Sequence, residues 1–265
     1  MADEDWTTRV WEPSCAQRPL VASLPHGSAA LPARFARGLT LREERLWVDA
    51  FTPELYAFLP ELGAITVEAA VSRLIADPNR DAGGAAYGPF GRAIVASTDT
   101  MGASIYREPP SAAELAERIA LGHAGYHDAL DAALGRLAPW PTVLLLDLHS
   151  FGAPVDADVI LGDSHGRTAS PRSVDVVEAA FTAAGFRVVR NRRYAGGWIV
   201  RRFADDPHVD AIQIELNQRT YIDPAWVDAN RLPRPHDPTR IGPVAVRLRA
   251  AVDAALRSYT AMAGT

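Results

Sequence analysis

Short apolar runs alternate with longer amphipathic segments along the chain. The apolar runs predict buried β-strands, because such strands read as hydrophobic stretches bounded by turn residues. The amphipathic segments predict helices, and Ser111 with Glu114 three residues later forms a capping box at the start of one of them. The strands expected from this pattern are 20–24, 65–71, 93–97, 143–148, 159–161, 186–190 and 211–216, and the helices are 53–62, 112–137, 174–184 and 243–261.

The alternation of strands and helices predicts a three-layer α/β domain with a mostly parallel sheet. The chain has 265 residues, of which 48% are hydrophobic, so it is long enough to bury one large core. We therefore expect a single domain over residues 1–265. Segments 78–92 and 232–242 are rich in Pro and Gly and are expected to be loops.

Composition narrows the possible partners. The formal net charge is −5, and no dense Lys/Arg run is present, which argues against a nucleic-acid or membrane-surface partner. The single cysteine, Cys15, excludes an intramolecular disulfide. No stretch has the length and hydrophobicity of a signal peptide or membrane span, so we expect a cytoplasmic protein. The sequence does not indicate an oligomeric state.

Polar residues with metal-binding chemistry stand where two predicted strands end. His26 follows the apolar run 20–24, and Asp147 and His149 close the run 143–148. The carboxyl ends of strands form the ligand-binding edge of α/β sheets. Asp147 and His149 share one face of their strand, and a carboxylate beside a histidine often orients a metal-binding imidazole. The alternative for Asp147 and His149 is a structural Asp with a hydrogen-bonded His.

Glu215 interrupts an Ile/Leu run in the last predicted strand. Burial of an unpaired carboxylate lowers the stability of the folded protein or leaves the group protonated. A functional role would explain why Glu215 stands at this position. Together with His26 and His149, it suits a hydrolytic zinc site with protein ligands, an open position for water and a carboxylate as general base. A salt bridge or an exposed edge position is the alternative. His123 and His127 are spaced like ligands on a helix, but the adjacent glutamate of such motifs is missing.

Two further segments carry candidate substrate-binding residues. Arg73 and Arg80 flank Asn79, and a guanidinium can grip a carboxylate through two hydrogen bonds. Without a nearby active site, they would be surface residues. Gly196 and Gly197 permit a loop to approach a ligand closely. Arg201 or Arg202, a few residues later, is a candidate for a second substrate carboxylate or is a solvated side chain.

Several motifs occur in an order that resembles the N-formylglutamate amidohydrolase family, a branch of the zinc carboxypeptidase and aspartoacylase superfamily. The resemblance covers about residues 20–225. It is carried by LPHGS, SRLIADPNRD, GASIYREPPSAAELAERI, YHDAL, LLLDLHSFG, VILGD, NRRYAGGWIVRRF and IQIELNQRTYID. It implies a carboxypeptidase-like α/β fold with a mixed central sheet and one zinc ion.

The resemblance also implies roles for individual residues. It makes His26 and His149 zinc ligands and Glu215 the catalytic carboxylate. By the same similarity, Arg73 would polarise the scissile carbonyl group. Asn79 and Arg80 would hold the carboxylate of the substrate. Tyr126 and His127 match a family position and would line the pocket.

The third zinc ligand is expected to be Asp49. In the wider superfamily, a glutamate follows the first histidine by three residues, but this position is Ala29. Family members place an acid before a helix start similar to the one after Asp49. Glu43 and Glu44 are alternatives, and Asp49 could instead be an ordinary helix N-cap. Pro78 also departs from the family pattern and is expected to stiffen the turn beneath the substrate.

These residues together predict zinc-dependent hydrolysis of an N-acyl, and specifically N-formyl, amino acid such as N-formyl-L-glutamate. The products would be formate and the amino acid. One alternative is a hydrolase of the same fold that acts on another amide, such as a peptide or a longer N-acyl amino acid. The other is a non-catalytic metal- or ligand-binding relative, although such a protein would not need Glu215.

Overall fold

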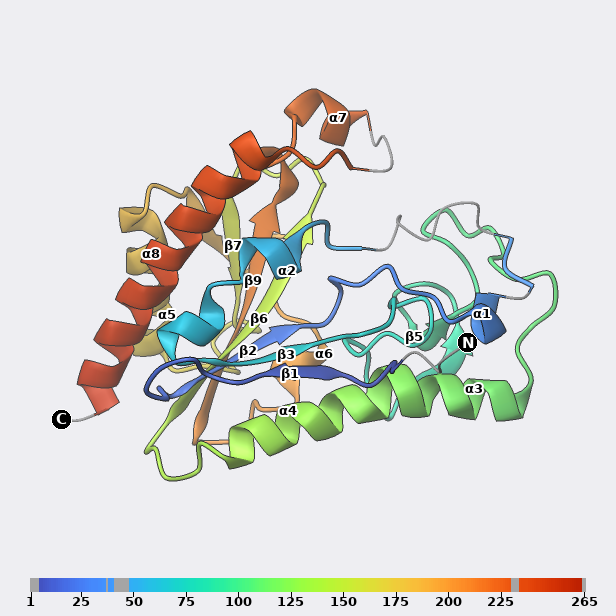
Figure 1. Cartoon of the computed structure of the whole chain (residues 1–265), viewed down its shortest axis with the longest axis horizontal. Coiled ribbons are helices and arrows are strands. Elements are labelled where there is room, and N and C mark those ends of the chain that lie inside the picture. Colours follow the sequence, from blue (N-terminus) through green and yellow to red (C-terminus); the bar gives the residue numbers. More distant parts are fainter. Residues whose placement is uncertain (1–4, 37, 41–47, 230–233, 264–265) are drawn as a thin grey trace.

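A seven-stranded sheet forms the centre of the molecule in the computed structural model, which describes residues 5–36, 38–40, 48–229 and 234–263 (Figure 1). The strand order is β1-β3-β2-β6-β9-β7-β8. These strands are β1 (Arg9–Trp11), β2 (Leu20–Leu24), β3 (Ile65–Glu68), β6 (Val143–Phe151), β7 (Val159–Gly162), β8 (Val188–Arg190) and β9 (Val209–Asn217).

The sheet is mixed, with a parallel centre. Strands β3, β2, β6 and β9 run parallel, whereas β1 and β7 lie antiparallel to their inner neighbours β3 and β9. Strand β8 is parallel to β7. This arrangement confirms the prediction of a mixed, mostly parallel sheet. The likeness to zinc carboxypeptidases stays a prediction.

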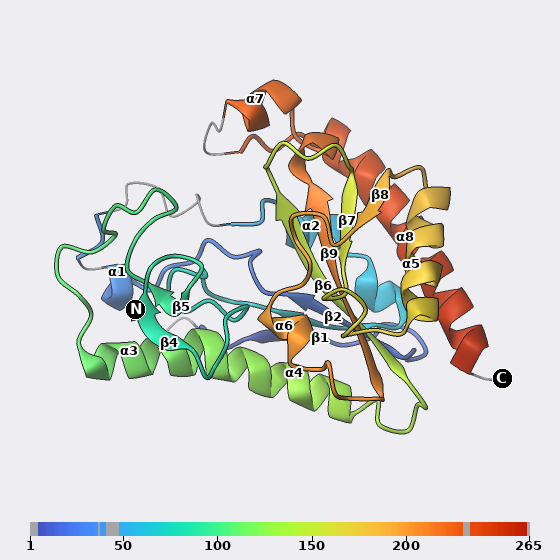
Figure 2. The same ribbon diagram turned by 180° about the vertical axis from the view of Figure 1, so that it is seen from behind.

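Helices cover both faces of the sheet, which gives three layers (Figures 1 and 2). Helices α2, α5 and α8 contribute to the larger hydrophobic core on one face, and α4 and α6 contribute to the core on the other face. The helices are α1 (Ala33–Ala36), α2 (Thr52–Leu55), α3 (Ala112–Ile119), α4 (Gly125–Gly135), α5 (Pro171–Ala183), α6 (Trp198–Arg201), α7 (Pro224–Asp228) and α8 (Pro238–Ala263). The 3₁₀ turns within the described residues are Leu59–Leu62 and Gln218–Thr220.

The two-residue period of the strands decides where the polar residues lie. On β6, Leu146 packs in the core with α5 and α8, and Leu145 packs in the core with α4 and α6. Asp147 and His149 have the same parity as Leu145, so they point to the α4 and α6 side. Glu215 lies beside His149 on the neighbouring strand β9 and shares that side.

The helix expected over 53–62 is instead the short helix α2 followed by the 3₁₀ turn Leu59–Leu62, and further features differ from the sequence-based expectations. The helix expected over 112–137 is divided by a π-turn, Ala120–Ala124, between α3 and α4. Strand β5 (Ala93–Ala96) lies outside the central sheet and pairs with β4 (Ala85–Gly88). The exposed edge strand β1 has only three residues and was not predicted.

The start of the last helix also differs from the expectation. Helix α8 begins at Pro238, ahead of the expected start at Pro243. Ile241 and Val244 both pack in the core, so burial outweighs the hydrogen bond that Pro243 cannot donate. Among the described residues, no helix is long and apolar enough to cross a membrane.

Candidate active site

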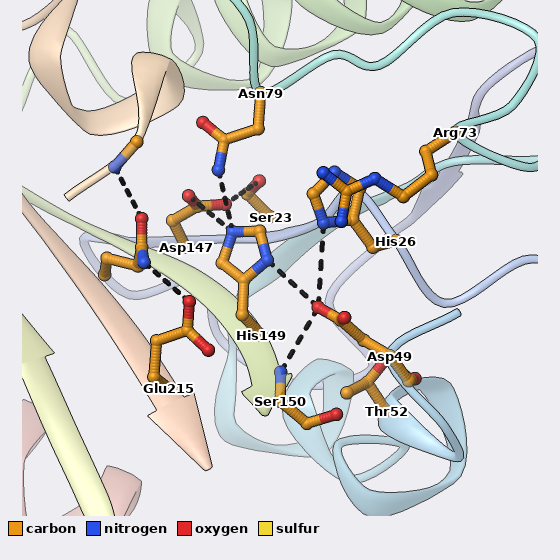
Figure 3. A network of polar contacts seen from close by, with 12 residues as sticks. Ser23, His26, Asp49, Thr52, Arg73, Asn79, Asp147, His149, Ser150 and Glu215 are labelled. Carbon is orange, nitrogen blue, oxygen red and sulfur yellow. Dashed lines mark hydrogen bonds and ion pairs between the residues drawn. The ribbon is translucent and has the colours of Figure 1, made fainter. Parts of the chain in front are cut away.

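The carboxyl ends of β2, β6 and β9 place the predicted catalytic residues next to one another (Figure 3). His26 lies two residues after β2, whereas His149 and Glu215 are opposite each other in the β6–β9 register. All three side chains line a cleft with a volume of about 870 Å³. The structure therefore brings together residues that are far apart in the sequence.

His26, Asp49 and His149 form a buried cluster that could hold a metal ion. One potential ligand atom from each residue lies within 4.8 Å of the other two. Asp49 Oδ2 is 3.0 Å from His149 Nδ1 and 3.6 Å from His26 Nδ1. The Ser150 backbone N–H also donates to Asp49 Oδ2, at 3.2 Å. These three residues are the predicted ligand set, and no other such group occurs in the described residues.

Asp49 faces the histidines because of its backbone anchors. Its N–H donates to the His26 carbonyl at 2.9 Å, and its own carbonyl accepts from Thr52 Oγ1 at 2.9 Å. The residue that caps α2 is Phe51, which makes no side-chain cap. The alternative of an N-cap role for Asp49 is therefore wrong. The other proposed ligands, Glu43 and Glu44, lie outside the described residues.

A second carboxylate orients each histidine of the cluster. His26 Nε2 is 2.8 Å from Asp77 Oδ1, and His149 Nε2 is 2.9 Å from Asp147 Oδ2. An imidazole that donates its Nε2–H in this way presents Nδ1 toward Asp49. His26 Nδ1 is buried without a hydrogen-bond partner among the described residues. Two oriented imidazoles, one carboxylate and this unpaired nitrogen fit a metal centre.

Charge interactions inside the cluster oppose the effect of burial. Burial alone would lower the pKa of His149, but the carboxylates of Asp147 and Asp49 raise it well above its ordinary value. Burial would likewise raise the pKa of Asp49, but the hydrogen bond from His149 and the nearby charge of His26 hold it well below its usual range. Without a cation, His149 thus keeps a second proton, on the Nδ1 atom that faces Asp49. A metal ion bound to this nitrogen would displace that proton.

Glu215 is buried beside the cluster without a cationic partner in hydrogen-bonding contact among the described residues. Burial raises the pKa of Glu215 to about 8, although the charge of His149 opposes the shift. Gln213 Nε2 donates to Glu215 Oε1 at 2.8 Å, and Gln213 Oε1 accepts from the Gly197 N–H at 2.6 Å. A carboxyl group with a pKa near neutrality is suited to accept and return protons.

Arg73, Asn79 and Arg80 line the cleft, as the sequence predicted for substrate-binding residues. Both arginines pair with Asp77 Oδ2, Arg73 at 2.5 Å and Arg80 at 3.2 Å. Asn79 Oδ1 accepts from the Ile199 N–H at 2.9 Å, and its Nδ2 is 3.2 Å from His149 Nε2. Asp77 thus connects the cationic groups to His26, a role that sequence reasoning missed.

Gly196 and Gly197 also line the cleft, and both positions require glycine. Gly196 has a φ of +122°, which side chains rarely adopt. A Cβ at Gly197 would lie 2.2 Å from the Asn79 amide. Arg201, by contrast, is exposed on α6 and is not among the residues that line the cleft. Its predicted contact with substrate has no support from this placement.

The helix histidines have structural partners. His123 Nε2 is 2.8 Å from the Arg80 carbonyl oxygen, and His127 Nε2 is 2.9 Å from the Pro78 carbonyl oxygen. His127 and Tyr126 do not line the cleft, which corrects the expectation for them. The Tyr126 hydroxyl lies 2.8 Å from Ser23 Oγ, and Ser23 donates to Asp147 at 2.8 Å. These residues support the groups that surround the metal cluster.

Comparison with known families identifies the relatives of the chain. The family model described as N-formylglutamate amidohydrolase matches residues 18–222, which include every residue of the site described above. The chain belongs to the N-formylglutamate amidohydrolase family. An N-formylglutamate deformylase of Pseudomonas aeruginosa is 34% identical over 77% of this chain and 82% of its own length. The enzyme of the same name from Pseudomonas putida is 30% identical over the same shares.

One solved structure agrees with this family assignment, and a second shares the fold. An N-formylglutamate amidohydrolase from Ralstonia eutropha superposes with a TM-score of 0.77 at 25% identity, and the match covers 94% of this chain and 98% of that one. A protein from Agrobacterium tumefaciens has a TM-score of 0.68 at 18% identity, over 95% of this chain and 97% of its own. The second likeness shows the fold alone.

Proposed function

We propose that this protein hydrolyses N-formyl-L-glutamate, or a closely related N-formyl amino acid, to formate and the free amino acid. The observation that carries this proposal is the buried His26–Asp49–His149 cluster beside Glu215 in an arginine-lined cleft. The relatives named N-formylglutamate deformylase support the same reaction. A small anionic substrate also fits a cleft with several guanidinium groups.

Zinc is the metal that we propose for the cluster. Two imidazole nitrogens and one carboxylate oxygen form a common ligand set of catalytic zinc sites, which leave one position open. His26, His149 and Asp49 would hold the ion, and Asp77 and Asp147 would orient the two imidazoles. When bound, zinc would act as a Lewis acid and lower the pKa of water toward about 7.

Glu215 performs the proton transfers in this mechanism. The positive charge of a bound metal ion would favour the ionised form of Glu215, and this carboxylate accepts a proton from the attacking water as the new C–O bond forms at the formyl carbon. It then returns this proton to the amide nitrogen as the C–N bond breaks, so that the amine leaves together with formic acid, which ionises to formate by releasing the second proton of the water to the amine or to solvent. Such general acid–base catalysis contributes roughly a hundredfold to ten-thousandfold. Gln213 holds the carboxylate in place through its 2.8 Å contact.

Three neighbouring side chains bind and orient the substrate. Arg73 lies at the cleft wall beside His26 and would stabilise the negative charge that develops on the carbonyl oxygen (Figure 3). Arg80 and Asn79 would hold the α-carboxylate, which turns an encounter into a reactive geometry. Because Asp77 accepts hydrogen bonds from Arg73 and forms an ion pair with Arg80, both guanidinium groups are already oriented before substrate arrives.

Replacing Glu215 by Gln tests the proposal, because this change keeps the shape of the side chain and removes the base. Formate release from N-formyl-L-glutamate should fall at least about a hundredfold in the Glu215→Gln variant, while the zinc content stays near that of the wild type. Glu117→Gln, on the exposed surface, is the matched control. Loss of zinc in Glu215→Gln would make Glu215 a ligand and Asp49 wrongly assigned. Undiminished turnover would refute the mechanism.

A further inference from the structure

The arginines of the cleft are not equivalent in their partners. Arg73 and Arg80 pair with Asp77, and Arg219 pairs with Asp228. Arg193 also lines the cleft, but no carboxylate among the described residues pairs with it. Its guanidinium lies 5.6 Å from the centre of the Tyr194 ring, and its Nε donates to the Tyr194 hydroxyl at 3.3 Å. Arg193 therefore keeps donors for an anion that enters the cleft.

The loop that carries Arg193 joins β8 to α6 (Figure 2) and is anchored at both ends. At its start, the Asn191 N–H donates to the Leu161 carbonyl at 2.8 Å, and Asn191 Nδ2 donates to Asp163 Oδ1 at 2.6 Å. At its end, the Gly197 N–H donates to Gln213, the residue that also holds Glu215. The loop is thus fixed to strand β7 and to the proposed catalytic carboxylate.

The backbone of the loop adopts conformations that are unusual for side chains other than glycine. Arg193 has a φ of +71°, and Asn191 has a φ of +53°. Asparagine tolerates this left-handed region well, whereas arginine at positive φ is uncommon. Such conformations persist where the surrounding structure determines them, and they are concentrated at ligand-binding positions. The anchored loop therefore presents the Arg193 side chain from a defined backbone position in the cleft wall.

We propose that Arg193 binds the side-chain carboxylate of the substrate and so makes the enzyme selective for acidic N-formyl amino acids. This inference rests on the proposed function, in which Arg80 and Asn79 hold the α-carboxylate. A dicarboxylic substrate then needs a second cationic partner in the same cleft. The guanidinium of Arg193 can form two parallel hydrogen bonds with a carboxylate, and the Tyr194 hydroxyl keeps its own proton as a further donor.

A pair of matched substrates tests this role. N-formyl-L-glutamine has nearly the shape of N-formyl-L-glutamate but lacks the side-chain charge. In Arg193→Gln, kcat/KM for N-formyl-L-glutamate should fall roughly 10- to 100-fold, the range expected for a lost charge-assisted hydrogen bond. For N-formyl-L-glutamine, the fall should be less than about threefold, which also shows that the variant is folded.

Two further variants sharpen the measurement. Arg193→Lys keeps the charge but not the paired donors, so its loss with N-formyl-L-glutamate should be intermediate. Arg192→Gln changes the exposed neighbour in the same loop, which does not line the cleft, and should leave the ratio of the two substrates unchanged. The loss in Arg193→Gln should appear mainly as a higher KM, because the side-chain carboxylate takes no part in bond cleavage.

The outcomes separate this proposal from the function on which it rests. Equal losses for both substrates in Arg193→Gln would overturn the specificity role and leave the deformylase proposal standing. The same conclusion would follow if the wild-type protein hydrolysed both substrates with equal kcat/KM. A zinc-loaded wild-type protein that releases formate from neither substrate would overturn both proposals.

Discussion

Glu215→Gln is expected to remove much of the pH dependence of stability from the metal-free protein. Burial raises the pKa of Glu215 from 4.5 to about 8. Between these two pH values, the unfolded chain has released the proton that the folded protein retains. The free energy of unfolding must therefore fall as pH rises, since the unfolded state binds fewer protons. The stability that the retained proton of Glu215 contributes is complete below pH 4.5 and is lost as pH approaches 8.

The pKa shift of Glu215 sets the size of this effect. Each pH unit within the window costs at most about 1.36 kcal/mol of stability. Between pH 5 and pH 7, the Glu215 contribution is therefore roughly 2 to 3 kcal/mol. His149, whose pKa is also raised, changes stability in the same direction. The difference between the wild type and Glu215→Gln isolates the glutamate, because Gln does not titrate.

Urea denaturation in the presence of a chelator measures this difference at pH 5, 6, 7 and 8. Glu215→Gln should gain stability relative to the wild type by roughly 2 to 3 kcal/mol as pH rises from 5 to 7. Glu117→Gln should follow the wild type, because Glu117 is half-exposed and pairs with Arg34 on the surface. A constant difference between the wild type and Glu215→Gln over this range would refute the claim that burial keeps Glu215 protonated.

The remaining predictions concern the metal and the α-carboxylate. The purified protein should contain about one zinc ion per chain, and His26→Ala or His149→Ala should sharply reduce both zinc content and activity. Atomic absorption measures the zinc content. Full zinc content in the variant that carries both His26→Ala and His149→Ala would refute the assignment of these histidines as zinc ligands. Arg80→Lys should cost roughly 1 to 3 kcal/mol in kcat/KM for N-formyl-L-glutamate, and less when the α-carboxylate is capped as an amide. Equal losses for the capped and uncapped substrates would show that Arg80 does not bind this group.

Sequence reasoning located the strand-end residues because parallel strands bring their carboxyl ends to one edge of a sheet. This rule needs only the apolar runs before His26 and His149, and it placed both histidines correctly. Glu215 was found for a different reason, since a carboxylate inside an Ile/Leu run demands an explanation. Asp49 lies in no such strand, and its assignment came from the family resemblance.

The partners of these residues could not be predicted in the same way. The contact of Asp77 with His26 depends on how the loop after residue 76 folds over the end of β2, and no local pattern encodes that path. Gln213 stands two residues before Glu215, but its bond to Gly197 depends on the conformation of a distant loop. The π-turn at Ala120–Ala124 lies inside a segment with ordinary helical periodicity, so the pattern predicted one continuous helix.

The segment 77–80 shows why these missed contacts matter for the chemistry. Asp77 uses one carboxylate oxygen for His26 and the other for Arg73 and Arg80, so one side chain orients both a proposed metal ligand and the cationic groups. His123 and His127 hold the carbonyls of this segment from the helical side. Gly122 allows that approach, because a Cβ there would lie 3.1 Å from the Ala76 carbonyl oxygen. Metal binding and substrate binding thus depend on the position of a single turn, which the stiff Pro78 and the two histidines keep fixed.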